Sequence, residues 1–140
     1  MPELAEVEYY RRQWNEGVGG RVTKVALHAQ KRLFRGADTK ALRRELTGAR
    51  LLRSEARGKR MLFFFSGNNW LGLHLGMSGK MSLAKPNHRA EKHEHLILSQ
   101  AKRTLVFRDA RMFGRVQFHH GKEAPSWWNG AVPEIGSRQF

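Results

Sequence analysis

The residues best suited to carry chemistry stand at the start of the chain, where Pro2 is followed by Glu3. If Met1 is removed, Pro2 presents a secondary amine that is less basic than lysine, so part of it is unprotonated and nucleophilic near neutral pH. Such an amine can attack a sugar C1′ and form an iminium, and a neighbouring carboxyl such as Glu3 can protonate the opening ring. The alternative is that Pro2 and Glu3 only begin a helix, a common use of this pair.

Two further candidates stand beside glycines. Lys59 follows Gly58 between two strand-like segments, where a lysine can hold a phosphate or move a proton. In a chain with 26 Lys and Arg residues, however, a single lysine is more often a solvated charge. Met77 stands between Gly76 and Gly79, so its apolar side chain can project from a turn as a wedge between stacked bases. The alternative is a core methionine beside a turn.

A third group combines arginine, phenylalanine and histidine. Arg111 and Phe113 lie on a turn between two predicted strands, where a guanidinium can fill a vacated base position while the ring stacks on its neighbour. The alternative is an Asp109–Arg pair beside a buried phenylalanine. His93 and His95 are two residues apart, but the chain offers no thiol and no clear third ligand, so we expect no metal site. A phosphate contact from His93 is the preferred interpretation.

The composition indicates a polyanionic partner. The 140 residues hold 26 Lys and Arg against 12 Asp and Glu, a formal net charge of +14, and a surface this basic repels itself unless a partner neutralises it. Nucleic acid is the leading candidate, and the alternatives are a ribosome-like structural role and a basic surface kept for solubility. With 40% hydrophobic residues, the chain has enough apolar material for one compact domain.

The absence of cysteine excludes disulfides, Cys-ligated zinc and a thiol nucleophile in this chain, which fits a reducing cytosol. No apolar run is long enough to span a bilayer, and residues 1–20 lack the cationic start and hydrophobic stretch of a secretion signal. We therefore expect a cytoplasmic protein with no membrane partner.

The hydrophobic pattern predicts two helices and many strands. One helix begins at Pro2 and ends at the glycines of residues 17–20, and the other has Asp38 or Thr39 as its N-cap and ends at Gly48. Seven segments have the pattern of strands: 21–27, 49–55, 60–66, 70–75, 95–99, 104–108 and 115–119.

These elements define the expected fold class, which is mainly β (α+β). It is a two-layer β-sandwich of about seven to eight strands, flanked by two helices of which one is N-terminal. We assign residues 1–120 to this domain. Residues 121–140 are interpreted as the end of the domain and the start of an interdomain linker, because Pro, Gly and Trp residues interrupt any periodicity there.

Five motifs occur in an order and spacing that resemble one family. They are Met-Pro-Glu-Leu-Ala-Glu-Val-Glu at 1–8, Gly58-Lys59, His74-Leu75-Gly76-Met77-Ser78-Gly79, Lys92-His93-Glu94-His95 and Asp109-Ala110-Arg111-Met112-Phe113-Gly114. The chain thereby resembles the N-terminal catalytic domain of the formamidopyrimidine-DNA glycosylase family, whose relatives include endonuclease VIII. Three positions depart from the family pattern: Ala5 and Ala110 stand where proline is usual, and Met112 where a second arginine is common.

The resemblance implies a base-excision-repair enzyme. Such a DNA glycosylase and AP lyase removes oxidised purines, formamidopyrimidine and 8-oxoguanine, and then cleaves the abasic site by β- and δ-elimination. Its partner would be damaged double-stranded DNA, and it would work as a monomer without a cofactor. By position, the implied roles are Pro2 as Schiff-base nucleophile, Glu3 as proton donor, Lys59 as the lysine that assists elimination and contacts phosphate, Met77, Arg111 and Phe113 as the side chains that replace the everted nucleotide, and His93 as a backbone contact.

The resemblance also carries an expectation about length. Family members are about twice as long and have a helix-two-turn-helix domain and usually a zinc finger, both of which we expect to be absent from this chain. We therefore expect the chain alone to bind duplex DNA weakly and to show little or no glycosylase activity. If Met1 is retained, the Pro2 nitrogen is an amide and cannot form an iminium. The competing hypothesis is a non-catalytic nucleic-acid-binding module on the same scaffold.

Overall fold

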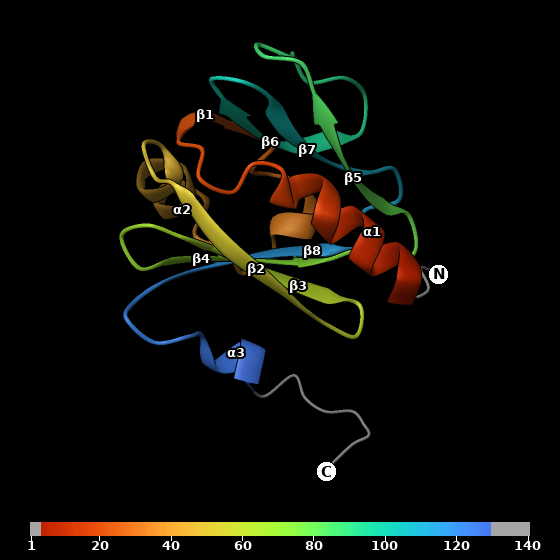
Figure 1. The fold of residues 1–140 in the computed structure, drawn as a ribbon. Helices are drawn as coiled ribbons and strands as arrows, with labels where there is room; N and C mark the ends of the chain where they lie inside the picture. Colours follow the sequence, from red (N-terminus) through yellow and green to blue (C-terminus); the bar gives the residue numbers. More distant parts are fainter. Residues whose placement is uncertain (1–3, 130–140) are drawn as a thin grey trace.

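Two four-stranded antiparallel sheets packed face to face form the body of the protein (Figure 1). The computed structural model describes residues 4–129. One sheet has the strand order β1-β6-β7-β5 and the other β2-β3-β4-β8. The strands are β1 (Val22–Leu27), β2 (Leu51–Arg57), β3 (Arg60–Phe65), β4 (Asn69–His74), β5 (Gly79–Ala84), β6 (Glu94–Gln100), β7 (Thr104–Asp109) and β8 (Arg115–His120). The expected two-layer β-sandwich is confirmed.

Strand β5 lies where the sequence pattern predicted no strand. It pairs with β7 along its whole length, from Gly79 opposite Asp109 to Ala84 opposite Thr104. Its composition is poor in β-branched and aromatic residues, which is why the local pattern did not reveal it. Burial of Met81 and pairing with β7 stabilise β5, so this strand depends on its tertiary surroundings.

Two helices close the open sides of the sandwich. Helix α1 (Leu4–Asn15) contacts β5 and β2, one edge strand from each sheet, and α2 (Thr39–Leu46) contacts the two opposite edge strands, β1 and β8 (Figure 1). A helix that covers a sheet edge keeps the edge from pairing with another chain. Among residues 4–129, no helix combines the length and the apolarity needed to cross a bilayer.

Helix α1 is fixed by contacts along its length. Trp14 is fully buried, and its indole Nε1 donates to the carbonyl of Val106 at 3.1 Å. On the same helix, the guanidinium of Arg11 binds the carboxylate of Glu8 and donates to the hydroxyl of Ser54 at 2.9 Å. These bonds to strands of both sheets set the position of the helix relative to the sandwich.

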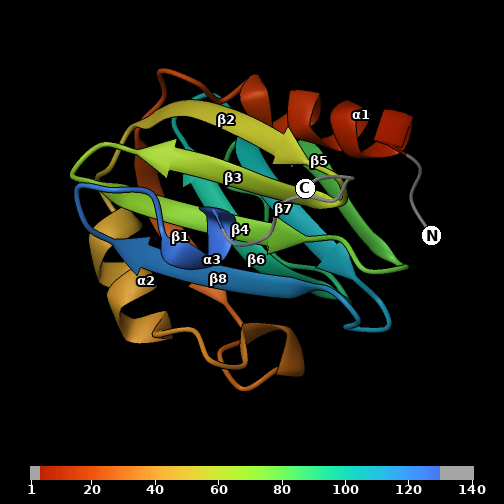
Figure 2. The ribbon, with the colours of Figure 1, turned by 90° about the horizontal axis from the view of Figure 1, so that it is seen from below.

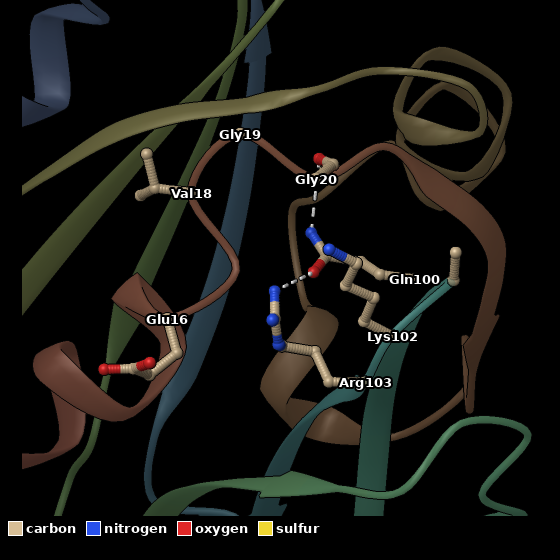
Figure 3. Close-up of a pocket in the computed structure, with 8 residues that line it drawn as sticks. Glu16, Val18, Gly19, Gly20, Gln100, Lys102 and Arg103 are labelled. Carbon is tan, nitrogen blue, oxygen red and sulfur yellow. Dashed lines mark hydrogen bonds between the residues drawn. The ribbon is translucent and has the colours of Figure 1, made fainter.

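A buried amide holds the chain that follows α1 (Figure 3). Nε2 of Gln100 donates to the carbonyls of Gly17 at 3.0 Å and Gly20 at 3.2 Å, and its Oε1 accepts from Arg103 at 3.5 Å. A Cβ at either glycine would lie within 2.9 Å of this amide, so a larger residue at either position would displace the Gln100 side chain. The cavity of about 390 Å³ at this place lies at the far ends of β6 and β7 from the sequence motifs.

Helix α2 begins and ends as its sequence predicts. Asp38 is the N-cap, because its Oδ1 accepts a hydrogen bond from the backbone N–H of Ala41 at 3.0 Å. Leu42 and Leu46 are fully buried between the sheets, and Gly48 adopts a φ of +89° just after the helix.

Two short elements were not predicted. A 3-10 turn, η1 (Arg32–Phe34), contacts β8, and helix α3 (Ser126–Asn129) lies over the outer face of the β2-β3-β4-β8 sheet (Figure 2). Trp128 of α3 is buried against Leu62 and Trp70 of that face. The assignment of residues 121–140 to a domain end and linker stays a prediction, since residues 130–140 lie outside the described part of the chain.

Candidate nucleic-acid interface

The sequence motifs meet at one end of the sandwich. Figure 2 shows the N-terminal end of α1, the β2–β3 turn, the β4–β5 loop and the β7–β8 loop on the same side of the molecule, at the right of the view. We call this end the motif edge and define it by residues 57–60, 75–78, 93 and 110–114. Pro2 and Glu3, the predicted nucleophile and proton donor, lie outside the described residues.

Lys59 lies in the tight β2–β3 turn. Gly58 before it has a φ of +58°, a conformation that L side chains rarely adopt. The turn is tight because Arg57, the last residue of β2, is paired with Arg60, the first residue of β3. The Lys59 side chain is half-buried and forms no ion pair within the described chain. An ammonium group with no carboxylate partner is available to an anion from outside.

Two large apolar side chains project from the motif edge. The exposed fractions are 57% for Met77 on the β4–β5 loop and 46% for Phe113 on the β7–β8 loop. Arg111, two residues before Phe113, is exposed as well. The alternative of a core methionine is wrong, and so is that of a buried phenylalanine. Exposed Met and Phe beside an arginine are the side-chain types that enter a base stack.

A buried carboxylate joins these two loops. Asp109 has no solvent exposure, and its Oδ1 accepts from the hydroxyl of Ser78 at 2.5 Å and from the backbone N–H of Met112 at 2.9 Å. Its Oδ2 accepts from the backbone N–H of Gly114 at 2.8 Å. The Ser78 hydroxyl in turn accepts from the N–H of Arg111 at 3.1 Å. The sequence alternative of an Asp109–Arg pair is therefore wrong, because the carboxylate binds backbone groups and a serine.

Arg32 supports the β7–β8 loop from the 3-10 turn. Its guanidinium donates to the carbonyl of Met112 at 3.3 Å, and its central carbon lies 5.5 Å from the centre of the Phe113 ring. This cation–π contact holds the ring without covering it. Sequence reasoning missed Arg32, since no local signal links it to a loop eighty residues away.

The two candidate histidines have different surroundings. His93 precedes β6 with a φ of +70°, its side chain is half-buried, and its carbonyl accepts from the N–H of Asp109 at 2.9 Å. His95 is buried, and its Nδ1 lies 3.0 Å from Nδ1 of His28. Burial, followed by the charge of His28, lowers the pKa of His95. Within residues 4–129, no three His, Asp or Glu side chains cluster as metal ligands.

His74, the last residue of β4, is a further histidine and directly precedes the motif-edge residues 75–78. The N–H of Gly76 donates to its Nδ1 at 3.0 Å, so the neutral ring carries its hydrogen on Nε2. Burial, followed by the positive charges of Arg60, Lys59 and Arg35, lowers the pKa of His74. The motif edge is thus a cationic surface with two exposed apolar side chains, a combination suited to a polyanion that contains aromatic bases.

Comparison with known proteins identifies the family of this chain. Residues 1–116 match the family model described as the formamidopyrimidine-DNA glycosylase N-terminal domain. The chain belongs to this family. It is 36% identical over 118 residues to the formamidopyrimidine-DNA glycosylase of Solibacter usitatus, covering 84% of this chain and 43% of the relative. It is 39% identical over 117 residues to that of Methylobacillus flagellatus, covering 83% and 41%.

Solved structures of the family have the same fold. A crystal structure of the Lactococcus lactis Fpg with DNA containing an abasic site matches with a TM-score of 0.75 and 32% identity, over 84% of this chain and 44% of that one. A complex of the same species' protein with DNA containing FAPY-dG matches with a TM-score of 0.74. The chain thus spans less than half the length of the relatives and structures that it matches. The family roles of the motif residues stay predictions for this chain.

Proposed function

We propose that this chain carries the catalytic groups of a DNA glycosylase and AP lyase that acts on oxidised purines in double-stranded DNA. Pro2 is the nucleophile and Glu3 the proton donor, while Lys59 contacts phosphate and assists elimination. The enzyme acts as a monomer in the cytosol or nucleoid. The observation that carries the proposal is the motif edge, where exposed Met77 and Phe113 lie at the same end of the sandwich as the N-terminal end of α1, on loops joined by one buried carboxylate.

The first chemical step forms a bond between enzyme and sugar. The free amine of Pro2 attacks C1′ of the damaged nucleotide, the bond to the oxidised base breaks, and the base leaves with a proton. Glu3 protonates the ring oxygen as the sugar opens, which leaves an iminium ion between the Pro2 nitrogen and C1′. Loss of a proton from C2′ then expels the 3′ phosphate by β-elimination, and δ-elimination expels the 5′ phosphate.

The exposed side chains of the motif edge support this chemistry, because the reacting sugar must leave the helix. Turning a nucleotide out of a duplex costs a few kcal/mol of stacking and pairing. Met77, Arg111 and Phe113 offset this cost when they occupy the vacated space. The links through Asp109 and Arg32 hold two of the three on a fixed loop, so little conformational entropy is lost on binding.

The test is borohydride trapping on duplexes that contain a preformed abasic site or a formamidopyrimidine lesion. Intact mass first establishes that Met1 has been removed. We expect slow trapping on the abasic duplex and little or no excision of the lesion by this chain alone. Pro2→Gly and Glu3→Gln are compared with the unaltered chain, and Glu16→Gln serves as a carboxylate control at the other end of α1.

The outcomes separate an enzyme from a binding module. Trapping that requires Pro2 and is slowed by Glu3→Gln supports the proposal, whereas a processed chain that binds the duplex but never traps is a non-catalytic binding module. Efficient excision of the lesion by the 140-residue chain would overturn the expectation of weak activity.

A further inference from the structure

Three cationic or titratable side chains lie in one row across the outer face of the β2-β3-β4-β8 sheet. Arg60 on β3 is directly opposite His74 on β4, and His74 is directly opposite Arg115 on β8. Directly opposite residues in antiparallel strands point to the same face, and like charges in such pairs destabilise a sheet. Because two arginines flank His74 on this face, a positive charge on the histidine is unfavourable, in line with its lowered pKa.

A cavity of about 390 Å³ lies over this row. Its lining comprises Arg35, Arg60, His74, Phe113, Arg115, Gln117 and Trp127. The lining holds three guanidinium groups and no carboxylate, and none of the three arginines forms an ion pair within the described residues. The two aromatic rings supply apolar walls. The chemistry of the cavity is thus that of a site for an anion attached to an apolar or aromatic group.

Arg115 has hydrogen-bonding capacity that the protein does not use. Its Nε is buried and has no partner among the described residues, while one Nη donates to the carbonyl of Arg35 at 3.5 Å. A buried donor without a partner costs about 1–3 kcal/mol. That cost is recovered when an oxyanion accepts from the guanidinium, which suits the fork geometry of arginine.

The position of the cavity indicates which kind of anion can reach it. Phe113 lies both on its rim and among the exposed side chains of the motif edge, and Lys59 adjoins Arg60. A strand of nucleic acid that Phe113 enters therefore brings its phosphates to the mouth of the cavity. A volume of about 390 Å³ is in the range of small-molecule sites and exceeds the needs of a bare phosphate.

We propose that Arg35, Arg60 and Arg115 form a site for the phosphoryl group of a nucleotide, with Trp127 and Phe113 against its sugar or base. The phosphoryl group comes either from the backbone of an unbroken strand or from a terminal phosphate at a strand break. Only the second source rests on the proposed function, because elimination at an abasic site leaves terminal phosphates.

The first experiment measures binding of small probes without any turnover. Inorganic phosphate, thymidine 3′-phosphate and the dinucleotide TpT are titrated into the chain, and NMR follows the Trp127 indole and the His74 ring. We expect thymidine 3′-phosphate or TpT to shift both signals and to raise the pKa of His74, which now lies among Arg60, Lys59, Arg35 and Arg115 without a counter-charge. Arg115→Gln and Arg35→Gln should each weaken this binding about tenfold.

The second experiment distinguishes the two sources. Anisotropy gives the affinity for an intact duplex, for a gapped duplex with terminal phosphates and for the same gap after dephosphorylation. If Arg35→Gln lowers the affinity for all three DNAs by about tenfold, the site binds a backbone phosphate. If it lowers the affinity for the phosphorylated gap alone, the site binds a terminal phosphate. With a backbone phosphate, the slope of affinity against salt falls by about one in the variant.

Arg103→Gln is the matched control, because Arg103 lies at the far ends of β6 and β7 and should change affinity less than twofold. Arg115→Lys keeps the charge but loses the fork and should give an intermediate affinity. The proposal is overturned if folded Arg35→Gln and Arg115→Gln bind every probe and duplex as Arg103→Gln does. Failure of borohydride trapping leaves these binding results unaffected, so the two proposals can fail separately.

Discussion

Ser78 donates a hydrogen bond of 2.5 Å to Asp109, a carboxylate with no solvent exposure, and this bond joins the loop of Met77 to the loop of Phe113. Two backbone N–H groups of the second loop bind the same carboxylate. One buried group thereby sets the relative position of two exposed side chains that belong to different loops. Both oxygens of this carboxylate accept hydrogen bonds, so each of them holds part of the arrangement in place.

Asp109→Asn should destabilise the protein although it preserves the size of the side chain. One oxygen is replaced by an NH₂ group, which faces N–H or O–H donors and leaves at least one of them unpaired. We expect the free energy of unfolding to fall by about 2–3 kcal/mol, as measured by urea denaturation. Asp38→Asn is the control, since asparagine and aspartate cap a helix equally well and the change should stay below about 0.5 kcal/mol. Equal effects of the two substitutions would contradict this role for Asp109.

Met77→Ala and Phe113→Ala should change DNA binding and leave stability almost unaltered. Both side chains are about half exposed, so their truncation removes little buried apolar area and should change the free energy of unfolding by less than about 0.5 kcal/mol. Loss of one stacking or wedging contact should weaken binding to an abasic-site duplex by about tenfold. Anisotropy titration against abasic and intact duplexes measures this effect.

The controls for that prediction are exposed apolar residues away from the motif edge. Val18 and Leu52 have exposed fractions of 41% and 42%; Val18 lines the cavity beside Gln100, and Leu52 lies near the start of β2, away from the β2–β3 turn. Their alanine variants should bind both duplexes as the unaltered chain does. A comparable loss of affinity in Leu52→Ala would show that general surface hydrophobicity, and not the position of Met77 and Phe113, is responsible.

Local signals in the sequence predicted most of the fold. The acidic cap at Asp38 and the spacing of Leu42 and Leu46 define α2, and short apolar segments such as those of β3, β4, β6 and β7 indicate strands. Strand β5 and helix α3 had no such signal, because their residues are stabilised by partners far away in the chain. The neighbouring tryptophans of α3 have no periodicity, and their positions depend on Gly72 beneath Trp127 and on Leu62 and Trp70 against Trp128.

The candidate site was predicted only in part. Family motifs identified Lys59, Met77 and Phe113, and the structure brings their loops together. The support from Arg32 and the row of Arg60, His74 and Arg115 could not be predicted, because they depend on the register of three strands and on a long-range contact. Register is set by packing of the whole sheet, so no short motif reports it.

Glu8→Gln should reduce stability in a pH-dependent way. The hydrogen bonds from Arg11 lower the pKa of Glu8 from 4.5 to about 2, with Arg12 adding to the effect and burial opposing it. A carboxyl whose pKa is lower in the folded state stabilises the fold above its unfolded pKa, near 4.5, and this contribution is lost as the pH falls toward 2.

The expected loss in Glu8→Gln is less than about 1 kcal/mol at pH 7, because these are partly exposed pairs within one helix. Urea denaturation at pH 7 and at about pH 3 should show a smaller difference between variant and unaltered chain at the lower pH. Glu16 forms no ion pair within the described residues, so Glu16→Gln should have little effect at either pH. A difference for Glu8→Gln that grows on acidification would contradict the assignment.

Gly72→Ala should displace Trp127 from the outer face of the β2-β3-β4-β8 sheet. An added Cβ would lie 2.6 Å from two carbons of the Trp127 ring, so the ring or the strand must move. We expect the free energy of unfolding to fall by about 1–3 kcal/mol, the usual cost of inserting a methyl group into a filled space. The decisive measurement is the same substitution in a Trp127→Ala background, where the added methyl group finds open space and should cost less than about 0.5 kcal/mol. An equal cost in both backgrounds would mean that Gly72 is needed by the strand and not by the tryptophan.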